Sequence, residues 1–120
     1  MTTPTSVIEA LAAAQLAAYN AKDLDAFCAC YSEDVEVFRM PATAPALVGM
    51  AQFRANYVAT FLNPLIQAHV PTRVPMGNKC MDYEVCVKDP SQPPLELMVI
   101  YEANKAGKIC KATFFMREDH

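Results

Sequence analysis

Apolar residues at the start of the chain recur at helical spacing. Ser6 and Glu9 have the spacing of a capping box, in which each side chain satisfies a free backbone amide, so a helix is predicted to begin there. Asp23 is a typical helix-capping residue and predicts a second, short helix. The first helix presents one apolar stripe to the core, and a single glutamine interrupts it. The stripe consists of Ile8, Leu11, Gln15, Ala18 and Tyr19.

Strand-like alternation begins after the second helix. Val35, Val37 and Arg39 share one side of a strand predicted over residues 35–40, because successive side chains of a strand point to opposite faces. A loop with two prolines follows, and Gly49 introduces a third helix of about three turns.

The rest of the chain has the pattern of a sheet. Four strands are predicted over residues 66–76, 79–88, 95–103 and 108–117, joined by turns that contain glycine, asparagine or proline. Helices first and strands afterwards are typical of the α+β class. A chain of 120 residues is long enough for one hydrophobic core, so we expect a single domain over residues 1–120.

The charge and hydropathy of the chain argue against nucleic acid and membranes as partners. Ten Lys and Arg residues are scattered singly and the net charge is −3, so no surface is expected to bind nucleic acid. The N-terminus lacks the regions of a signal peptide, and no apolar run approaches the ~18 residues that would span a membrane. We therefore expect a soluble, cytoplasmic protein with no membrane partner.

The cysteines argue against two kinds of structural cross-link. They are Cys28, Cys30, Cys80, Cys86 and Cys110. Their odd number and the lack of a CxxC pair are not typical of a disulfide framework or of structural zinc. We expect buried free thiols, no metal and no cofactor.

Two stretches are the most informative for the fold. They are residues 19–27, which contain Asp23-Leu24-Asp25, and residues 31–38, which contain Ser32-Glu33-Asp34. With the helix after Gly49, they closely resemble the opening of the nuclear transport factor 2-like superfamily, in particular its SnoaL-like and ketosteroid isomerase-like branch. The resemblance covers nearly the whole chain. It implies a cystatin-like α+β roll, a cone-shaped curved antiparallel sheet wrapped around three N-terminal helices.

The resemblance can be tested against the chemistry of ketosteroid isomerase. In that enzyme an aspartate base moves a proton, while a tyrosine and a protonated aspartic acid donate hydrogen bonds to the dienolate oxygen. Alignment with the family places the base at Arg39, the donor tyrosine at Gln15 and the aspartic acid at Val99. An arginine cannot abstract a proton at neutral pH, and both donors are missing. Only Tyr57 matches, at a position that supports the donor network in the family.

We expect the cone to enclose a cavity with apolar walls and a few polar groups, as small-molecule sites do. Arg39 and Tyr57 are the candidate catalytic residues, because a guanidinium in an apolar pocket favours a carboxylate or an enolate. The alternatives for Arg39 are an ion pair with Glu36, Glu102 or Asp82, or a side chain that extends to the solvent at the mouth of the cone. The candidate ligand-binding residues are Gln15, Tyr19, Val37, Phe53, Val99, Tyr101, Phe114 and Met116.

Three further titratable residues are assigned to the outer face of the sheet. Asp82 and Glu84 share one side of their strand with two cysteines, and we expect that side to be solvated and paired with lysine. His69 is expected on the outer face, as a surface or dimer-contact residue. A bulge at Pro71 would invert its direction and make His69 a candidate base.

Two functions remain open. The first is an enzyme that catalyses isomerisation or another proton transfer on a small, largely apolar carbonyl or carboxylate compound. The second is a non-catalytic ligand-binding or dimerisation module of the same fold. A homodimer is expected in either case, because the sheet face with Met98, Ile100, Thr113 and Phe115 is more apolar than solvent exposure would suggest.

Overall fold

The N-terminal helices begin at the residues that cap them. The computed structural model describes residues 6–117. Helix α1 (Val7–Ala21) is preceded by Ser6, whose side chain accepts a hydrogen bond from the backbone amide of Glu9, while the Glu9 side chain accepts from Ser6. Helix α2 (Leu24–Ala29) is preceded by Asp23, whose side chain accepts a hydrogen bond from the backbone amide of Ala26. Both predicted caps are confirmed.

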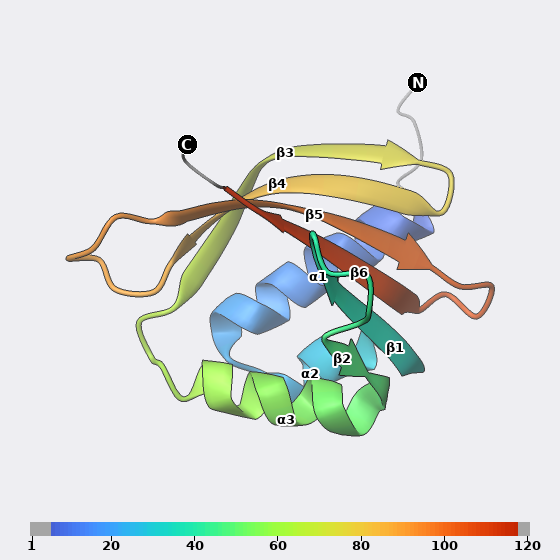
Figure 1. Ribbon diagram of the computed structural model, residues 1–120, viewed down its shortest axis with the longest axis horizontal. Coiled ribbons are helices and arrows are strands. Elements are labelled where there is room, and N and C mark those ends of the chain that lie inside the picture. The colour runs from blue at the N-terminus through green and yellow to red at the C-terminus, as the bar shows by residue number, and fades with distance from the viewer. Residues whose placement is uncertain (1–5, 118–120) are drawn as a thin grey trace.

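The strands form one sheet that curves around the helices (Figure 1). The strand order is β2-β1-β6-β5-β4-β3, and α3 lies between β2 and β3 in the chain. The bounds of these elements are β1 Tyr31–Arg39, β2 Leu47–Val48, α3 Gly49–Phe61, β3 Gln67–Met76, β4 Lys79–Val87, β5 Leu95–Ala103 and β6 Ile109–Met116.

The predicted α+β roll is confirmed, with three differences in detail. The short strand β2 was not predicted, and β1 begins at Tyr31, four residues earlier than the alternation of valines indicated. The sheet was predicted to be antiparallel, but within the described residues β1 and β6 run parallel, while the other strand pairs are antiparallel. The helices cover one face of the curved sheet, and no described helix lies on its other face (Figure 1).

Phe27 connects the helices with the sheet. Its ring contacts aromatic rings from α1, β1 and α3, at centroid separations from 4.6 to 5.9 Å. The contacting residues are Tyr19, Tyr31, Phe53, Tyr57 and Phe61. Four of these ring pairs are tilted or edge-on and the pair with Phe53 is stacked, and such pairs add specificity to apolar burial. This cluster fixes the position of α3, and with it the position of the Tyr57 side chain.

A bulge in β3 changes which side chains face the helices. The register between β3 and β4 shifts between His69 and Thr72, where Pro71 supplies no amide. Before the bulge Ala68 is buried and His69 is exposed; after it, Arg73 turns inward and pairs with Asp82. The bulge considered in the sequence is therefore present, but it reorients Arg73 and leaves His69 on the outside.

The expected direction of β4 was wrong. Cys80, Asp82 and Cys86 are buried on the face toward the helices, and Glu84 lies partly buried on the same face, whereas Met81 is 37% exposed on the outer one. The physical reason is that Arg73 neutralises Asp82, which removes most of the penalty of burying its charge. The solvated pairing with lysine expected for this side does not form.

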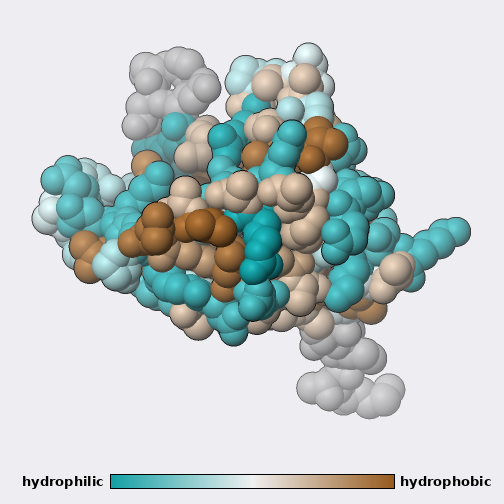
Figure 2. All heavy atoms as spheres, turned by 90° about the horizontal axis from the view of Figure 1, so that it is seen from below, coloured by the Kyte–Doolittle hydropathy of each residue, from teal (hydrophilic) through white to brown (hydrophobic). Residues whose placement is uncertain are grey.

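Two groups of apolar side chains remain accessible. On the outer face of the sheet, Met98 is 42% exposed and lies opposite Phe115, and Ile100 lies opposite Thr113. Figure 2, which views α3 from below, shows hydrophobic side chains gathered near the end of α3. The exposed apolar residues of that part of the chain are Val58, Leu62 and Leu65.

None of the described helices is long and apolar enough to cross a membrane. The longest, α1, has 15 residues.

We propose that the outer face of the sheet pairs two copies of the chain. Light scattering during size exclusion at micromolar concentration should give twice the mass of one chain. Met98→Lys should shift the mass to that of a monomer, because a buried ammonium in the centre of the interface would lack a partner. Val58→Lys, on a residue of similar exposure on α3, should leave the dimer intact. A monomeric wild type would contradict the proposal.

Candidate functional site

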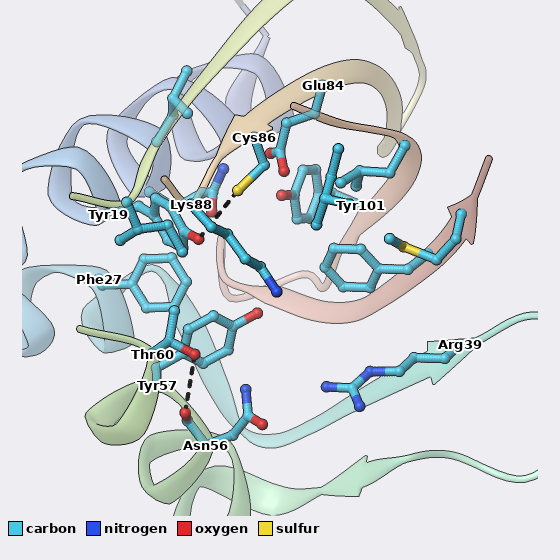
Figure 3. A pocket seen from close by; sticks show the side chains of 17 residues that line it. Tyr19, Phe27, Arg39, Asn56, Tyr57, Thr60, Glu84, Cys86, Lys88 and Tyr101 are labelled. Carbon is cyan, nitrogen blue, oxygen red and sulfur yellow. Dashed lines mark hydrogen bonds between the residues drawn. The ribbon is translucent and has the colours of Figure 1, made fainter. Parts of the chain in front are cut away.

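A cavity of about 400 Å³ lies between the inner face of the sheet and the helices. Figure 3 shows its polar side chains pointing into a common space from α1, α3, β1, β4 and β5. The lining residues are Gln15, Leu16, Tyr19, Phe27, Arg39, Asn56, Tyr57, Thr60, Ile66, Glu84, Cys86, Lys88, Leu95, Leu97, Tyr101, Phe114 and Met116. The cavity is therefore open to a small molecule and is not filled by the Phe and Met side chains.

Two tyrosine hydroxyls face the cavity without a protein partner. Tyr57 reaches in from α3 and Tyr101 from β5 (Figure 3), and neither hydroxyl has a hydrogen-bond partner among residues 6–117. Burial raises the pKa of both phenols, and the charge of Glu84 raises it further. Both therefore stay protonated at neutral pH and can donate a hydrogen bond to a ligand oxygen.

Two cationic side chains lie on another part of the wall. Arg39 extends from the end of β1 and Lys88 from the residue after β4, and both side chains are exposed (Figure 3). Neither forms an ion pair with any residue that the structure describes. The ion pairs considered for Arg39 in the sequence are absent there, so its guanidinium is available to an anionic or carbonyl oxygen.

Glu84 is the carboxylate of the cavity. It lies on β4 beside Cys86, and its side chain extends toward the space in front of Tyr101 (Figure 3). Burial, and secondly the charge of Asp82, raises the pKa of Glu84 from 4.5 to about 7. Within the described part of the chain no side chain or amide donates a hydrogen bond to it. It is an unpaired carboxyl group in a small-molecule cavity.

Asp82, two residues earlier on the same face, is fully buried and paired. Arg73 donates to it through Nε at 2.7 Å and through Nη2 at 2.9 Å, a bidentate arrangement. The guanidinium is itself mostly covered, with a side chain 21% exposed. Asp82 is therefore part of the framework of the cone, and Glu84 is the carboxylate that a ligand can reach.

Gln15 and Tyr19 are engaged with the protein although they line the cavity. The Gln15 amide oxygen accepts a hydrogen bond of 2.9 Å from the Tyr31 hydroxyl, and its nitrogen donates to the Ala12 carbonyl. The Tyr19 hydroxyl lies 3.8 Å from the sulfur of Cys86. These bonds hold α1 against β1 and β4 and leave little hydrogen-bonding capacity for a ligand.

The sequence-predicted site residues separate into two groups. Seven of them line the cavity: Gln15, Tyr19, Arg39, Tyr57, Tyr101, Phe114 and Met116. The other three, Val37, Phe53 and Val99, are buried in the core and are not among the lining residues. Their side chains pack against neighbouring apolar residues instead of reaching the open space.

Sequence reasoning missed three polar residues of the cavity, Glu84 and Cys86 on β4 and Lys88 just after it. The available signal was the pair of cysteines, because free cysteine is among the most frequently buried residue types. Cys80 and Cys86 are both buried, and all five cysteines are free thiols. The inward face of β4 follows from these two cysteines more reliably than the outward face follows from its two acids.

His69 lies outside the cavity. It is exposed on β3 before the bulge and opposes Val85 on β4. No cluster of three or more metal-ligating side chains occurs in residues 6–117.

Comparison with known proteins identifies the family. The family model of the SnoaL-like domain matches residues 12–112. No significant match is found among curated proteins.

Solved structures share the fold at low sequence identity. A proposed ketosteroid isomerase from Kribbella flavida has a TM-score of 0.81 at 19% identity and covers 95% of this chain and 80% of its own. A SnoaL-like protein of unknown function from Burkholderia thailandensis has a TM-score of 0.78 at 15% identity, over 98% of this chain and 100% of its own. An uncharacterised cystatin-fold protein from Novosphingobium aromaticivorans has a TM-score of 0.79 at 22% identity, over 92% and 98%.

The ion pair of Arg73 on β3 with Asp82 on β4 should contribute strongly to the free energy of unfolding. Arg73→Leu leaves the buried carboxylate uncompensated, so urea unfolding should show a loss of about 3 kcal/mol. The double variant Arg73→Leu/Asp82→Leu should recover most of that loss, because no charge then remains to be desolvated.

The matched control is Arg54→Leu, which removes an exposed ion pair with Asp25 and should change stability little. Equal losses in Arg73→Leu and Arg54→Leu would show that Asp82 is not buried as described.

Proposed function

We propose that this chain, which belongs to the family of SnoaL-like domains within the nuclear transport factor 2-like superfamily, binds a small, largely apolar carbonyl or carboxylate compound in its cavity. The observation that supports this most is the combination of apolar walls with Arg39, Lys88 and two tyrosine hydroxyls that lack a hydrogen-bond partner among the described residues. Apolar surface favours binding of the ligand body, and a few convergent polar groups orient its oxygen atoms.

The volume of the cavity limits the ligand to a modest size. A volume of about 400 Å³ is near the lower end of the range for small-molecule sites. Phe27, Leu97 and Phe114 supply flat or branched apolar surface. A ligand with one ring system or a short acyl chain and a single oxygen-bearing end matches this space and this distribution of polar groups.

Arg39 is the proposed anchor for the oxygen-bearing end. Its guanidinium presents parallel N–H donors that match the two oxygens of a carboxylate, whereas the Lys88 ammonium acts as a point charge. Tyr57 is the proposed partner for a carbonyl oxygen, because its hydroxyl faces the same space. No metal or cofactor is needed for this mode of binding.

A non-catalytic binding module is the second candidate. The positions that resemble the base and the donors of ketosteroid isomerase hold Arg39, Gln15 and Val99, and the Gln15 side chain is already bonded to Tyr31 and Ala12. These residues favour ligand binding over steroid isomerisation by the residue set of that enzyme. A reducing, cytoplasmic setting is part of either proposal, because free thiols are typical of it.

The test is ligand-dependent stabilisation. A thermal-shift panel would contain steroids, aromatic carboxylates such as 2-naphthoate, short acyl compounds and lactones. A compound at a hundred times its dissociation constant should add ~2.7 kcal/mol to the free energy of unfolding. We expect carboxylates to stabilise the wild type and to lose this effect in Arg39→Ala.

Arg54→Ala is the matched control, because Arg54 lies on the outer side of α3 and pairs with Asp25. It should respond to carboxylates as the wild type does. Stabilisation that survives in Arg39→Ala, or no stabilisation by any class of compound, would contradict the proposed role of the cavity.

A further inference from the structure

We infer that Glu84 is the general acid–base group of this cavity and transfers a proton on the bound carbonyl compound. The inference rests on the proposed ligand-binding function and adds the group that the sequence left unassigned. It places the base on β4, whereas the position that resembles the family's base, on β1, holds Arg39.

Two carboxylates on one face of β4 differ in their partners. Asp82 is held by the bidentate Arg73, so its oxygens are occupied. Glu84 has neither an ion pair nor a hydrogen bond within residues 6–117, and it lines the cavity. A carboxylate without a structural partner in a partly apolar cavity destabilises the fold, so its presence is better explained by a use in ligand chemistry.

Two hydroxyl groups that can donate hydrogen bonds lie around Glu84. Glu84 and Tyr101 extend into the cavity from neighbouring strands, and Tyr57 faces them from α3 (Figure 3). A ligand carbonyl that accepts a hydrogen bond from either hydroxyl would have its adjacent carbon inside the same small space. Glu84 and Tyr101 therefore lie on the sheet side of the cavity, and Tyr57 lies on the side of α3. This places a base and two oxygen-stabilising donors around one space, as a proton-transfer site requires.

The ionisable groups that face Glu84 come from every element packed around it. Its own strand contributes Asp82 and Cys86, with Lys88 just beyond, and β3 contributes Arg73, which is paired with Asp82. The others are Tyr19 from α1, Tyr57 from α3, Tyr31 and Arg39 from β1 and Tyr101 from β5. Burial, and secondly the charge of Asp82, raises the pKa of Glu84 to about 7. Both protonation states are then populated near neutral pH, as an acid–base group requires.

The proposed step is a balanced proton transfer. The ionised Glu84 takes a proton from the carbon next to the ligand carbonyl, and the electron pair of that C–H bond forms a carbon–carbon double bond while the carbonyl becomes an enolate. Tyr57 or Tyr101 donates a hydrogen bond to the enolate oxygen. The protonated Glu84 then returns its proton to carbon, and the carbonyl re-forms. No oxidant, reductant or metal enters the step.

The experiment uses a probe that reports a base in an apolar cavity without knowledge of the natural ligand. In 5-nitrobenzisoxazole, a base removes the proton on carbon 3, the C–H electrons complete a nitrile, and the N–O bond breaks to give a coloured 2-cyano-4-nitrophenolate. The wild type should catalyse this ring opening, and Glu84→Gln should lower the rate at least ~100-fold. Because the ionised carboxylate is the base, the wild-type rate should rise with pH and reach half its maximum at about 7.

The control is Glu102→Gln, which alters a carboxylate that pairs with Lys79 and does not line the cavity. It should keep the wild-type rate and pH profile. A wild type no faster than acetate at equal concentration, a Glu84→Gln variant with the full rate, or a half-maximum near pH 4.5 would each overturn the inference.

Binding of 2-naphthoate separates this inference from the proposed function. Glu84→Gln should bind it at least as tightly as the wild type, because a negative charge has been removed from the site, and this also shows that the variant is folded. Ring opening that depends on Glu84 without carboxylate binding would support the base and overturn the binding proposal. Carboxylate binding without Glu84-dependent ring opening would overturn the base alone.

Discussion

The burial of acidic side chains on the inner face of β4 is the constraint on which the cone depends. A carboxylate removed from water is costly unless a charge partner compensates it. Asp82 has such a partner in Arg73, which donates two hydrogen bonds to it, and Glu84 has none among the described residues. The same strand therefore contributes two acids with different parts. Asp82 stabilises the framework, and the charge of Glu84 is desolvated at the cavity.

The bulge in β3 makes that difference possible. Without the register shift between His69 and Thr72, Arg73 would share the outward direction of His69 and could not reach Asp82. The aromatic cluster around Phe27 then closes the opposite side and fixes the direction of Tyr57. Asn20 fastens the end of α1 to β3 through hydrogen bonds of 2.7 and 2.8 Å with the backbone of Ala68. The cavity is thus bounded by parts of the chain that are distant in sequence.

Local signals were sufficient for most of the fold. The caps at Ser6 and Asp23, the start of α3 at Gly49 and the bounds of β5 agree with the structure, because each depends on neighbouring residues. On β4 the two cysteines were the only local signal of the inward face, and the burial of Asp82 on that face depends on a pairing with Arg73 across a bulged strand. The position of Arg39 at the cavity followed from strand alternation, whereas Glu84 was assigned to the wrong face because acidic residues are seldom buried.

Proton transfer in this SnoaL-like domain requires Glu84 to be ionisable, accessible to a ligand and desolvated. The most direct test is a titration of the side-chain carboxyl carbons by nuclear magnetic resonance, with the Glu84 signal assigned by its loss in Glu84→Gln. Glu84 should titrate with a pKa of about 7. Titration of Glu84 near 4.5 would show that water or a partner compensates its charge, and it would contradict a role for this side chain in proton transfer.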